Sequence, residues 1–227
     1  MNEIPQRLAA VHRRIRAAAE AAGRQADEVA LLAVSKTKPA GDIVMAYREG
    51  QRQFGENYLQ DALPKIEALA ELAIEWHFIG RLQSNKAAEI SRHFAWVHGI
   101  DQYKHAVRLS DHRPMQAPPL QVCIQVNLSG ESTKGGVQPA ELPALAHVVA
   151  GLPRLRLRGL MTLPSPTTDL AAQHAVFAQL RELLEDLQRR GLELDTLSMG
   201  MSADMEAAIA EGSTMVRIGT DIFGPRG

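Results

Sequence analysis

The chain has 227 residues, of which 45% are hydrophobic and 22% are charged. A chain of this length can bury about 70% of the surface that it exposes when unfolded, which is enough for a full hydrophobic core. Lysine and arginine number 25 and aspartate and glutamate 26, so the net charge at pH 7 is −1. A nearly neutral chain lacks the positive field that gathers nucleic acid or anionic membranes, and we expect neither as a partner.

Cysteine content and the N-terminal sequence indicate the compartment. Cys123 is the single cysteine, which excludes an intramolecular disulfide and a cysteine-rich metal site. Its neighbours Val122 and Ile124 predict that it lies in the core. The first residues mix charged with apolar positions, so we expect neither a signal peptide nor a membrane anchor. Together these features predict a cytoplasmic protein.

Helix-like and strand-like segments alternate along the chain. Apolar residues at steps of three and four predict an opening helix over 4–22, which Gly23 can end. Strands are expected where short apolar runs occur, at 29–34, 53–55, 76–79, 95–99, 120–127, 157–161, 196–199 and 215–218. Further helices are expected at about 42–49, 59–72, 85–91, 102–111, 140–150, 170–190 and 203–211.

This alternation predicts an α/β fold with a parallel sheet, because connections between parallel strands are long and usually helical. A doubly wound open sheet would also alternate. Eight short units without a nucleotide-binding glycine pattern after the first strand favour a closed (β/α)8 TIM barrel. Only 221–227 follow the last strand, so we expect no eighth helix there and expect the N-terminal helix to cover that part of the wall. The whole chain, 1–227, is then one domain.

Two of the six lysines, Lys36 and Lys38, stand where the first strand ends, on the side of such a barrel that carries function. A lysine amine is almost fully protonated at pH 7 because its ordinary pKa is about 10.4. It forms a Schiff base only if it is desolvated or lies beside another cation, and Lys38 is a candidate for that cation. Position alone favours two ordinary surface lysines at a strand exit, since lysine is rarely buried unless it is paired.

Small residues near the last two strands indicate an anion site. Ser202 precedes the helix expected at 203–211, where it can serve as the N-cap and where the first N–H groups favour an anion. An ordinary cap without any ligand gives the same pattern. Asp204 would repel a phosphate if it faced inward, so we expect it to face outward. Gly219 and Thr220 add backbone N–H groups and a hydroxyl next to this turn, where TIM barrels often bind phosphate.

Arg217 is the third candidate. Alternation along 215–220 directs Val216 and Ile218 toward the helices and Arg217 toward the barrel interior. A buried guanidinium requires a partner, which is either a ligand or a structural carboxylate. No comparable pattern suggests a metal site, since His105 and His112 share a predicted helix but lie about 10 Å apart along it.

Five segments occur in order along the chain: AVSKTKP at 33–39, FGENY at 54–58, WHFIGRLQSNK at 76–86, SMGMS at 198–202 and VRIGTDIFG at 216–224. Together they resemble the YggS/PROSC family of pyridoxal 5'-phosphate homeostasis proteins. The resemblance implies a fold-type III, alanine racemase-like barrel without the second β domain, with pyridoxal 5'-phosphate held as a Schiff base on Lys36. The cofactor-binding residues that it implies are Lys36, Asn57, Met201, Ser202, Arg217, Gly219 and Thr220.

The resemblance also implies how these residues divide the work. Ser202, Gly219 and Thr220 would hold the phosphate with Met201 nearby, Asn57 would lie close to the ring, and Arg217 would face the pyridine nitrogen. Because arginine only donates hydrogen bonds, that nitrogen would stay unprotonated and the ring would be a weak electron sink. The sequence departs from the family pattern at two positions. Arg81 replaces a usual proline and Gly99 a usual small hydroxyl residue.

The function implied is vitamin B6 homeostasis, in which the protein buffers or delivers the cofactor and is not an enzyme. Barrel racemases and decarboxylases of this fold use a second domain for a catalytic acid or base, and we expect the barrel to leave no room for one in these 227 residues. The alternatives are a weak pyridoxal-phosphate-dependent amino-acid racemase, with Lys36 as one base, and an interaction module without cofactor. We expect apo forms of pyridoxal-phosphate enzymes as partners, a monomer or weak homodimer, and a transient role in transfer for Lys134.

Overall fold

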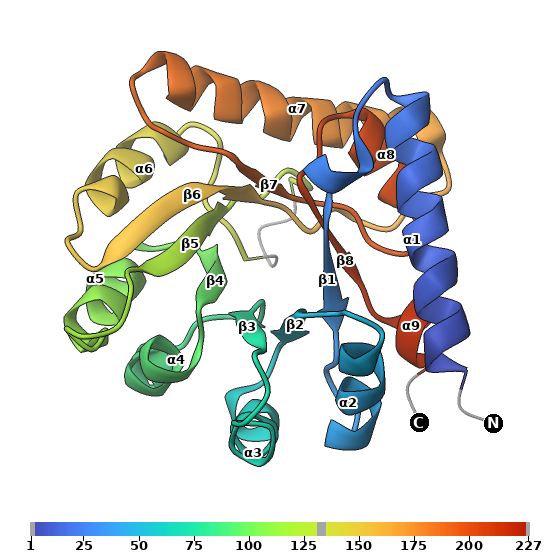
Figure 1. Ribbon diagram of the computed structural model, residues 1–227. Coiled ribbons are helices and arrows are strands. Elements are labelled where there is room, and N and C mark those ends of the chain that lie inside the picture. Colours follow the sequence, from blue (N-terminus) through green and yellow to red (C-terminus); the bar gives the residue numbers. More distant parts are fainter. Residues whose placement is uncertain (1–2, 131–134, 226–227) are drawn as a thin grey trace.

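The computed structural model describes residues 3–130 and 135–225 and forms a closed barrel of parallel strands, paired in chain order from β1 to β8 (Figure 1). Lys134 lies outside the described residues. The predicted (β/α)8 barrel is confirmed. The strands are β1 (Ala30–Val34), β2 (Gln53–Glu56), β3 (Glu75–Phe78), β4 (Trp96–Ile100), β5 (Leu120–Gln125), β6 (Leu155–Met161), β7 (Thr196–Ser198) and β8 (Met215–Ile218).

The barrel closes where the first and last strands pair. Leu32 lies opposite Arg217 and Ala33 opposite Ile218 in the β1–β8 register. This pairing brings the ends of β1 and β8, and therefore Lys36 and Gly219, to the same edge of the barrel. Strand boundaries differ from those expected by up to two residues. The fifth strand, for example, ends at Gln125 because Val126 leaves the ladder and forms an isolated bridge with Val137.

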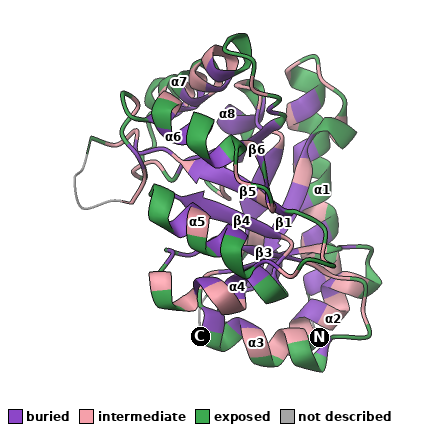
Figure 2. Ribbon diagram, turned by 90° about the vertical axis from the view of Figure 1, so that its left-hand side faces the viewer, coloured by how far each residue is buried: buried purple, intermediate pink, exposed green. Residues whose placement is uncertain are grey.

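Helices surround the barrel on its outside (Figure 1). Their inner faces are buried against the strands and their outer faces are exposed (Figure 2), and most of the buried residues are apolar. The α-helices are α1 (Ile4–Ala21), α2 (Ala40–Arg48), α3 (Leu59–Ala68), α4 (Ala87–His93), α5 (Tyr103–His112), α6 (Leu142–Ala150), α7 (Leu170–Arg189), α8 (Met205–Ala210) and α9 (Thr220–Phe223), with short 3-10 helices at Ala26–Glu28 and Ser84–Lys86.

The expected gap after the last strand needs a correction. A four-residue helix, α9, follows β8, because Ile222 and Phe223 are buried and their N–H groups donate to the Gly219 carbonyl. The N-terminal helix does cover this part of the wall, as predicted. α1 packs against α8 and α9 (Figure 1) and buries Ile4, Leu8, Val11, Ile15 and Ala19.

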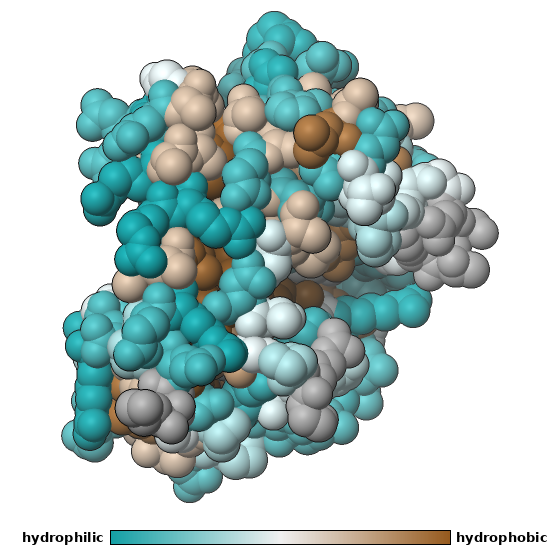
Figure 3. Space-filling view, turned by 90° about the vertical axis from the view of Figure 1, so that its right-hand side faces the viewer, coloured by the Kyte–Doolittle hydropathy of each residue, from teal (hydrophilic) through white to brown (hydrophobic). Residues whose placement is uncertain are grey.

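The core and the surface separate cleanly. Cys123 is fully buried on β5, as expected, and burial raises the pKa of its thiol to about 12. The face shown in Figure 3 carries mainly hydrophilic side chains, with apolar ones visible in the hollows between them. Within residues 3–130 and 135–225, none of the helices combines the length and apolar character needed to span a bilayer.

Candidate functional site

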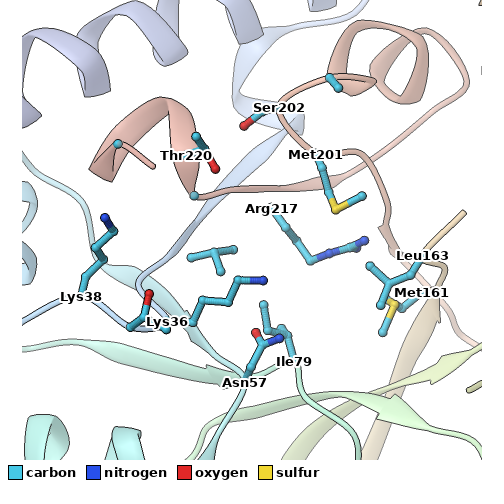
Figure 4. A pocket seen from close by; sticks show the side chains of 15 residues that line it. Lys36, Lys38, Asn57, Ile79, Met161, Leu163, Met201, Ser202, Arg217 and Thr220 are labelled. Atoms are coloured by element: carbon cyan, nitrogen blue, oxygen red, sulfur yellow. The ribbon is translucent and has the colours of Figure 1, made fainter. Parts of the chain in front are cut away.

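A cavity of about 350 Å³ lies at the C-terminal ends of the strands (Figure 4). Its volume falls within the range of small-molecule sites, about 300–1,000 Å³. The lining comes from β1, β6 and β8 and from the segments that follow β1, β2, β3, β6, β7 and β8. It includes every residue that the family resemblance assigned to a cofactor, namely Lys36, Asn57, Met201, Ser202, Arg217, Gly219 and Thr220.

Lys36 enters the cavity directly from the end of β1. Ser35 is fully buried and hydrogen-bonded to Gly55 of β2, so the backbone just before Lys36 is held in the barrel wall. Figure 4 shows the Lys36 side chain extending toward Asn57 and Arg217. Lys38 points the other way, and its Nζ donates to the Pro225 carbonyl at 2.7 Å. The cation toward which Lys36 points is therefore Arg217, not Lys38.

The turn after Lys36 is strained. Thr37 has a φ of 63°, and no other non-glycine residue that the structure describes has a positive φ. A β-branched residue adopts this left-handed conformation only at a cost, and such residues gather at functional sites. Lys38 N–H closes the turn by donating to the Ser35 carbonyl at 3.0 Å. The strain thus lies between the two lysines and separates the directions of their side chains.

A buried ion pair between Glu56 and Lys65 stabilises the backbone and side chain of Ser35, just after the end of β1. Glu56 Oε1 accepts from Ser35 Oγ at 2.6 Å and from Lys65 Nζ at 2.8 Å, and Lys65 also donates to the Ser35 carbonyl at 2.9 Å. Lys65 belongs to α3, and only the folded barrel brings it to Ser35. The sequence analysis missed this support because nothing in the local pattern around Lys65 distinguishes it from a surface lysine.

Asn57 follows β2 and carries an unpaired acceptor. Its Oδ1 is buried and has no hydrogen-bond partner among the residues that the structure describes. Gly80 lets the Asn57 backbone approach closely, since a Cβ at Gly80 would lie 1.9 Å from the Asn57 carbonyl oxygen. An unpaired buried amide oxygen is costly, and a ligand with a donor group would relieve that cost.

Arg217 forms the floor of the cavity and is only 4% exposed. Its Nη1 donates to the carbonyl and the hydroxyl of Ser198, and its Nη2 donates to the Thr162 carbonyl at 2.8 Å. These bonds use three of the five guanidinium N–H groups. The inward orientation was predicted correctly, but the hydrogen-bond partners are neutral oxygens instead of a carboxylate. Burial lowers the pKa of Arg217 to about 10.

The segment from Ser198 to Asp204 differs from what the sequence analysis expected. α8 begins at Met205, so Ser202 is not its N-cap. Asp204 is half-buried instead of facing outward, and its Oδ1 accepts from the Met201 N–H at 2.6 Å. Gly200, with φ 96°, turns the chain back on itself and makes this contact possible. Burial raises the pKa of the Asp204 carboxyl.

Ser202 and Thr220 lie at the end of the cavity opposite Asn57 (Figure 4), and Gly219, which precedes Thr220, also lines the cavity. A Cβ at Gly219 would lie 3.2 Å from the Val34 carbonyl oxygen, so the close approach of β8 to β1 favours glycine there. The first N–H groups of α9 point out of its N-terminal end, as in any helix. These groups and the two hydroxyls form an end suited to an anion.

Arg14 of α1 ties the two halves of this anion end together. Its guanidinium donates to the Ser202 carbonyl at 3.0 Å and also bonds Asp221 of α9 and Glu206 of α8. The helix that completes the barrel wall thus also fixes the spacing between the Ser202 turn and α9. The sequence analysis missed Arg14, since 192 residues separate it from Glu206.

Apolar side chains that were not predicted also line the cavity, among them Ile79, Met161 and Leu163. Each lies at or just after the C-terminal end of β3 or β6, and this position relative to the strand could have identified it as a lining residue. The two departures from the family pattern lie elsewhere. Arg81 is exposed, and neither it nor Gly99 is among the lining residues. A Cβ at Gly99 would lie 2.9 Å from the Gly80 carbonyl oxygen, behind the wall.

The cavity combines a lysine amine, a guanidinium, an unpaired amide oxygen and an anion-binding end, with apolar walls between them. This combination suits a flat, anionic molecule with a carbonyl group that reacts with amines. Within the described ranges no three His, Cys, Asp or Glu side chains lie close enough together to hold a metal ion.

Comparison with known proteins gives matches over the full chain. A family model described as alanine racemase, N-terminal domain, matches residues 6–227. The pyridoxal phosphate homeostasis protein of Pseudomonas aeruginosa is 60% identical over 226 residues, which cover 100% of this chain and 97% of that protein. Its counterpart in Escherichia coli K12 is 55% identical over 229 residues, with 100% and 98% covered.

Solved structures agree with the fold. PipY of Synechococcus elongatus, whose structure was determined with PLP bound, superimposes with a TM-score of 0.86 at 39% identity and covers 97% of this chain and 100% of PipY. Alanine racemase from Corynebacterium glutamicum gives a TM-score of 0.68 at 20% identity, over 95% of this chain and 60% of the racemase. At that identity the likeness concerns the fold alone.

Proposed function

Because the chain belongs to the family of the pyridoxal phosphate homeostasis proteins, we propose that it binds pyridoxal 5'-phosphate in the cavity described above and buffers or delivers this form of vitamin B6. The observation that carries the proposal is the placement of Lys36, which enters the cavity at the end of β1 and points toward Asn57 and Arg217. Ser202, Gly219 and Thr220 occupy the opposite end.

The residues present fit this cofactor. It supplies an aldehyde that reacts with a primary amine, a phosphate, and a ring with one hydroxyl group and one nitrogen. The Lys36 amine is the group that would attach it covalently, and the buried Asn57 Oδ1 is an acceptor still to be paired within the described residues. Ser202, Thr220 and the first N–H groups of α9 would bind the phosphate.

Arg217 would determine the protonation of the ring nitrogen. A guanidinium whose pKa is lowered to about 10 still holds its proton at pH 7, so Arg217 donates to a ring nitrogen and cannot accept from it. A nitrogen that accepts from Arg217 stays unprotonated, and the ring then withdraws electrons weakly. Such a site retains the cofactor without activating it for carbanion chemistry.

The lining also favours a carrier over a racemase. A racemase needs a second proton-transferring group opposite its lysine, and the described lining contains no tyrosine, cysteine, histidine or glutamate. Tyr58, next to Asn57, is 56% exposed and is not a lining residue.

We further propose that the protein acts in the cytoplasm, as a monomer or weak homodimer, and delivers its cofactor to apo enzymes.

The decisive experiment traps the cofactor on its lysine. The protein and its Lys36→Ala variant are incubated with pyridoxal 5'-phosphate, reduced with borohydride, digested and mapped by mass spectrometry. We expect a reduced adduct on Lys36 in the parent protein and none in the variant. Lys104→Ala, at an exposed position of α5, is the matched control and should keep the Lys36 adduct. An adduct confined to another lysine, or none at all, would refute the proposal.

A further inference from the structure

A chain of hydrogen-bonded side chains crosses the barrel interior from the cavity floor to the opposite end. Arg217 Nη1 lies 2.8 Å from Ser198 Oγ, and Ser198 Oγ lies 2.8 Å from His98 Nδ1. His98 Nε2 lies 2.9 Å from His77 Nδ1, and His77 Nε2 lies 3.0 Å from Glu75 Oε1. The chain therefore joins β8, β7, β4 and β3. Glu75 begins β3, so it lies at the end of the barrel away from the cavity.

Glu75 can only accept a hydrogen bond and Arg217 can only donate one, so these two ends fix the donor and the acceptor in every hydrogen bond between them. A carboxylate only accepts, so His77 Nε2 carries a proton and donates to Glu75, and Nδ1 of the neutral ring is an acceptor. His98 Nε2 must then donate to His77, which leaves His98 Nδ1 as an acceptor for the Ser198 hydroxyl. Ser198 Oγ in turn accepts from Arg217, which only donates. Every link is satisfied when both imidazoles are neutral, and each donates toward Glu75.

The surroundings of the two histidines favour that neutral state. Both rings are fully buried, and burial lowers the pKa of His77 and lowers that of His98 well below its usual value, with Arg217 and His77 adding to the shift of His98. His77 also stacks on Trp96 with ring centroids 5.3 Å apart and planes within 5°. Other charged or titratable groups lie near this path of hydrogen bonds or at its ends. They are Glu75 from β3, Cys123 from β5, Arg158 from β6, Asp195 before β7, Asp204 before α8 and Arg217 from β8.

We propose that His98, held by His77, is a positioning residue for Arg217: it fixes the rotation of the Ser198 hydroxyl and thereby the orientation of the guanidinium that faces the cofactor. The first half of this inference concerns the protein alone, and the second half rests on the proposed cofactor site. The Ser198 hydroxyl connects His98 to Arg217. It can offer a lone pair to Arg217 in a fixed direction only while its proton is engaged by His98 Nδ1.

The arrangement explains why polar histidines occupy the middle of two barrel strands. Side chains in the interior of a TM barrel are mostly branched and apolar. Two buried imidazoles cost less when each makes two hydrogen bonds, and here both do so. Any buried neutral imidazole needs two partners, one for its N–H and one for its bare nitrogen. The continuous path to Arg217 is what connects His98 to the cavity.

The first test reads the protonation of the rings in the protein without added cofactor. Nitrogen-15 NMR of the histidine side chains at pH 7 to 8 should show a protonated Nε2 and a bare Nδ1 for both His77 and His98. The Nη groups of Arg217 should give separate, slowly exchanging signals in the parent protein and averaged signals in His98→Leu. A protonated Nδ1 on His98, or unchanged Arg217 signals in His98→Leu, would overturn the inference whether or not the protein binds pyridoxal 5'-phosphate.

The second test uses the cofactor as a probe. His98→Leu removes both nitrogens, whereas His98→Gln keeps one acceptor and one donor at a similar spacing. We expect His98→Leu to shift the absorption maximum of bound pyridoxal 5'-phosphate and to weaken its retention about 10-fold, which corresponds to the loss of one good hydrogen bond. His98→Gln should restore much of both.

The matched control is Ser91→Ala, which deletes another buried hydrogen bond, the one from Ser91 Oγ of α4 to the Leu109 carbonyl of α5. It should lower stability without moving the absorption maximum. Equal spectra for His98→Leu and the parent protein, at full cofactor occupancy, would show that His98 has only a structural role. If neither protein binds the cofactor, the proposed function fails, and the NMR signals still decide the inference.

Discussion

The floor and the anion end of the cavity are built in different ways. At the floor, Arg217 is almost fully buried and hydrogen-bonded to Ser198 and Thr162 through side-chain nitrogens. At the anion end, Ser202 is partly exposed and Thr220 is exposed, and backbone groups and the first turn of a short helix provide much of the surface. There the connecting element is Arg14, a half-exposed residue of the N-terminal helix.

The contrast shows where the site is rigid and where it tolerates change. Interactions in the dry interior are strong, and leaving one partner unpaired there is costly. Ion pairs at the surface are weakened by water and salt and contribute up to about 1 kcal/mol. Substitutions at the floor should therefore affect both folding and the spectrum of a bound cofactor, whereas those at the anion end should mainly affect phosphate binding.

The largest effect is expected at the floor. Arg217→Met should lower the free energy of unfolding by about 3 kcal/mol, because it leaves the Ser198 and Thr162 oxygens without their donor. It should also shift the absorption maximum of bound pyridoxal 5'-phosphate. Urea unfolding measures the first effect. Arg113→Met is the control, since Arg113 is also buried and bonds backbone carbonyls away from the cavity.

The comparison of these two arginine variants is decisive for the role of the floor. Both should be destabilised, but only Arg217→Met should change the cofactor spectrum. If Arg113→Met shifts the spectrum as much, the floor has no special relation to the cofactor.

A second prediction concerns the loss of folding stability at acidic pH. Because burial lowers the pKa of His77 and His98 in the folded protein, the unfolded chain takes up protons first, near its ordinary histidine pKa of about 6.5. The stability contributed by the neutral rings is thus complete well above pH 6.5 and is lost as pH falls through this value, by at most about 1.4 kcal/mol per pH unit for each ring. Urea unfolding at pH 7.5, 6.5 and 5.5 measures this slope.

The variant His98→Gln should reduce that slope, because a glutamine does not titrate. His147→Gln, at an exposed position of α6, should leave the slope as it is. A slope that stays the same in His98→Gln would mean that other groups cause the acid sensitivity between pH 6.5 and 5.5.

The smallest effect is expected at the anion end. Arg14→Met should lower the free energy of unfolding by less than about 1 kcal/mol, since the Arg14 side chain is half-exposed and that of Glu206 is exposed. It should weaken phosphate binding by loosening the Ser202 turn against α9, without changing the absorption maximum of the bound cofactor. Competition by inorganic phosphate measures this effect. Arg13→Met, on the exposed side of the same helix, should change neither; a spectral shift in Arg14→Met would contradict the division between floor and anion end.

Much of this protein was predictable from the chain alone. The alternation of short apolar runs with helical stripes predicted the closed barrel, and the position of Lys36 after the first run placed it at the functional end. Alternation along β8 also predicted correctly that Arg217 faces inward. These inferences succeeded because the periods of strands and helices are local properties of the sequence.

The errors arose where a local pattern had two tertiary solutions. Ser202 has the composition of an N-cap, but Gly200 turns the chain so that Asp204 folds back onto Met201 and the helix starts later. The short α9 was missed because four residues give no periodic signal. Lys38 was paired with Lys36 by sequence spacing, but the strained Thr37 turns the two side chains apart.

The sequence by itself determined the strands, the helices and the residues that gather at one end of the barrel, because each of these depends on neighbours a few positions away. Only the tertiary structure decided which distant groups meet: Lys65 under Ser35, Arg14 between Ser202 and Asp221, and the path from Glu75 to Arg217. The physical reason is that hydrogen bonds and ion pairs depend on distances of about 3 Å. Closing the barrel sets those distances between residues up to 207 positions apart.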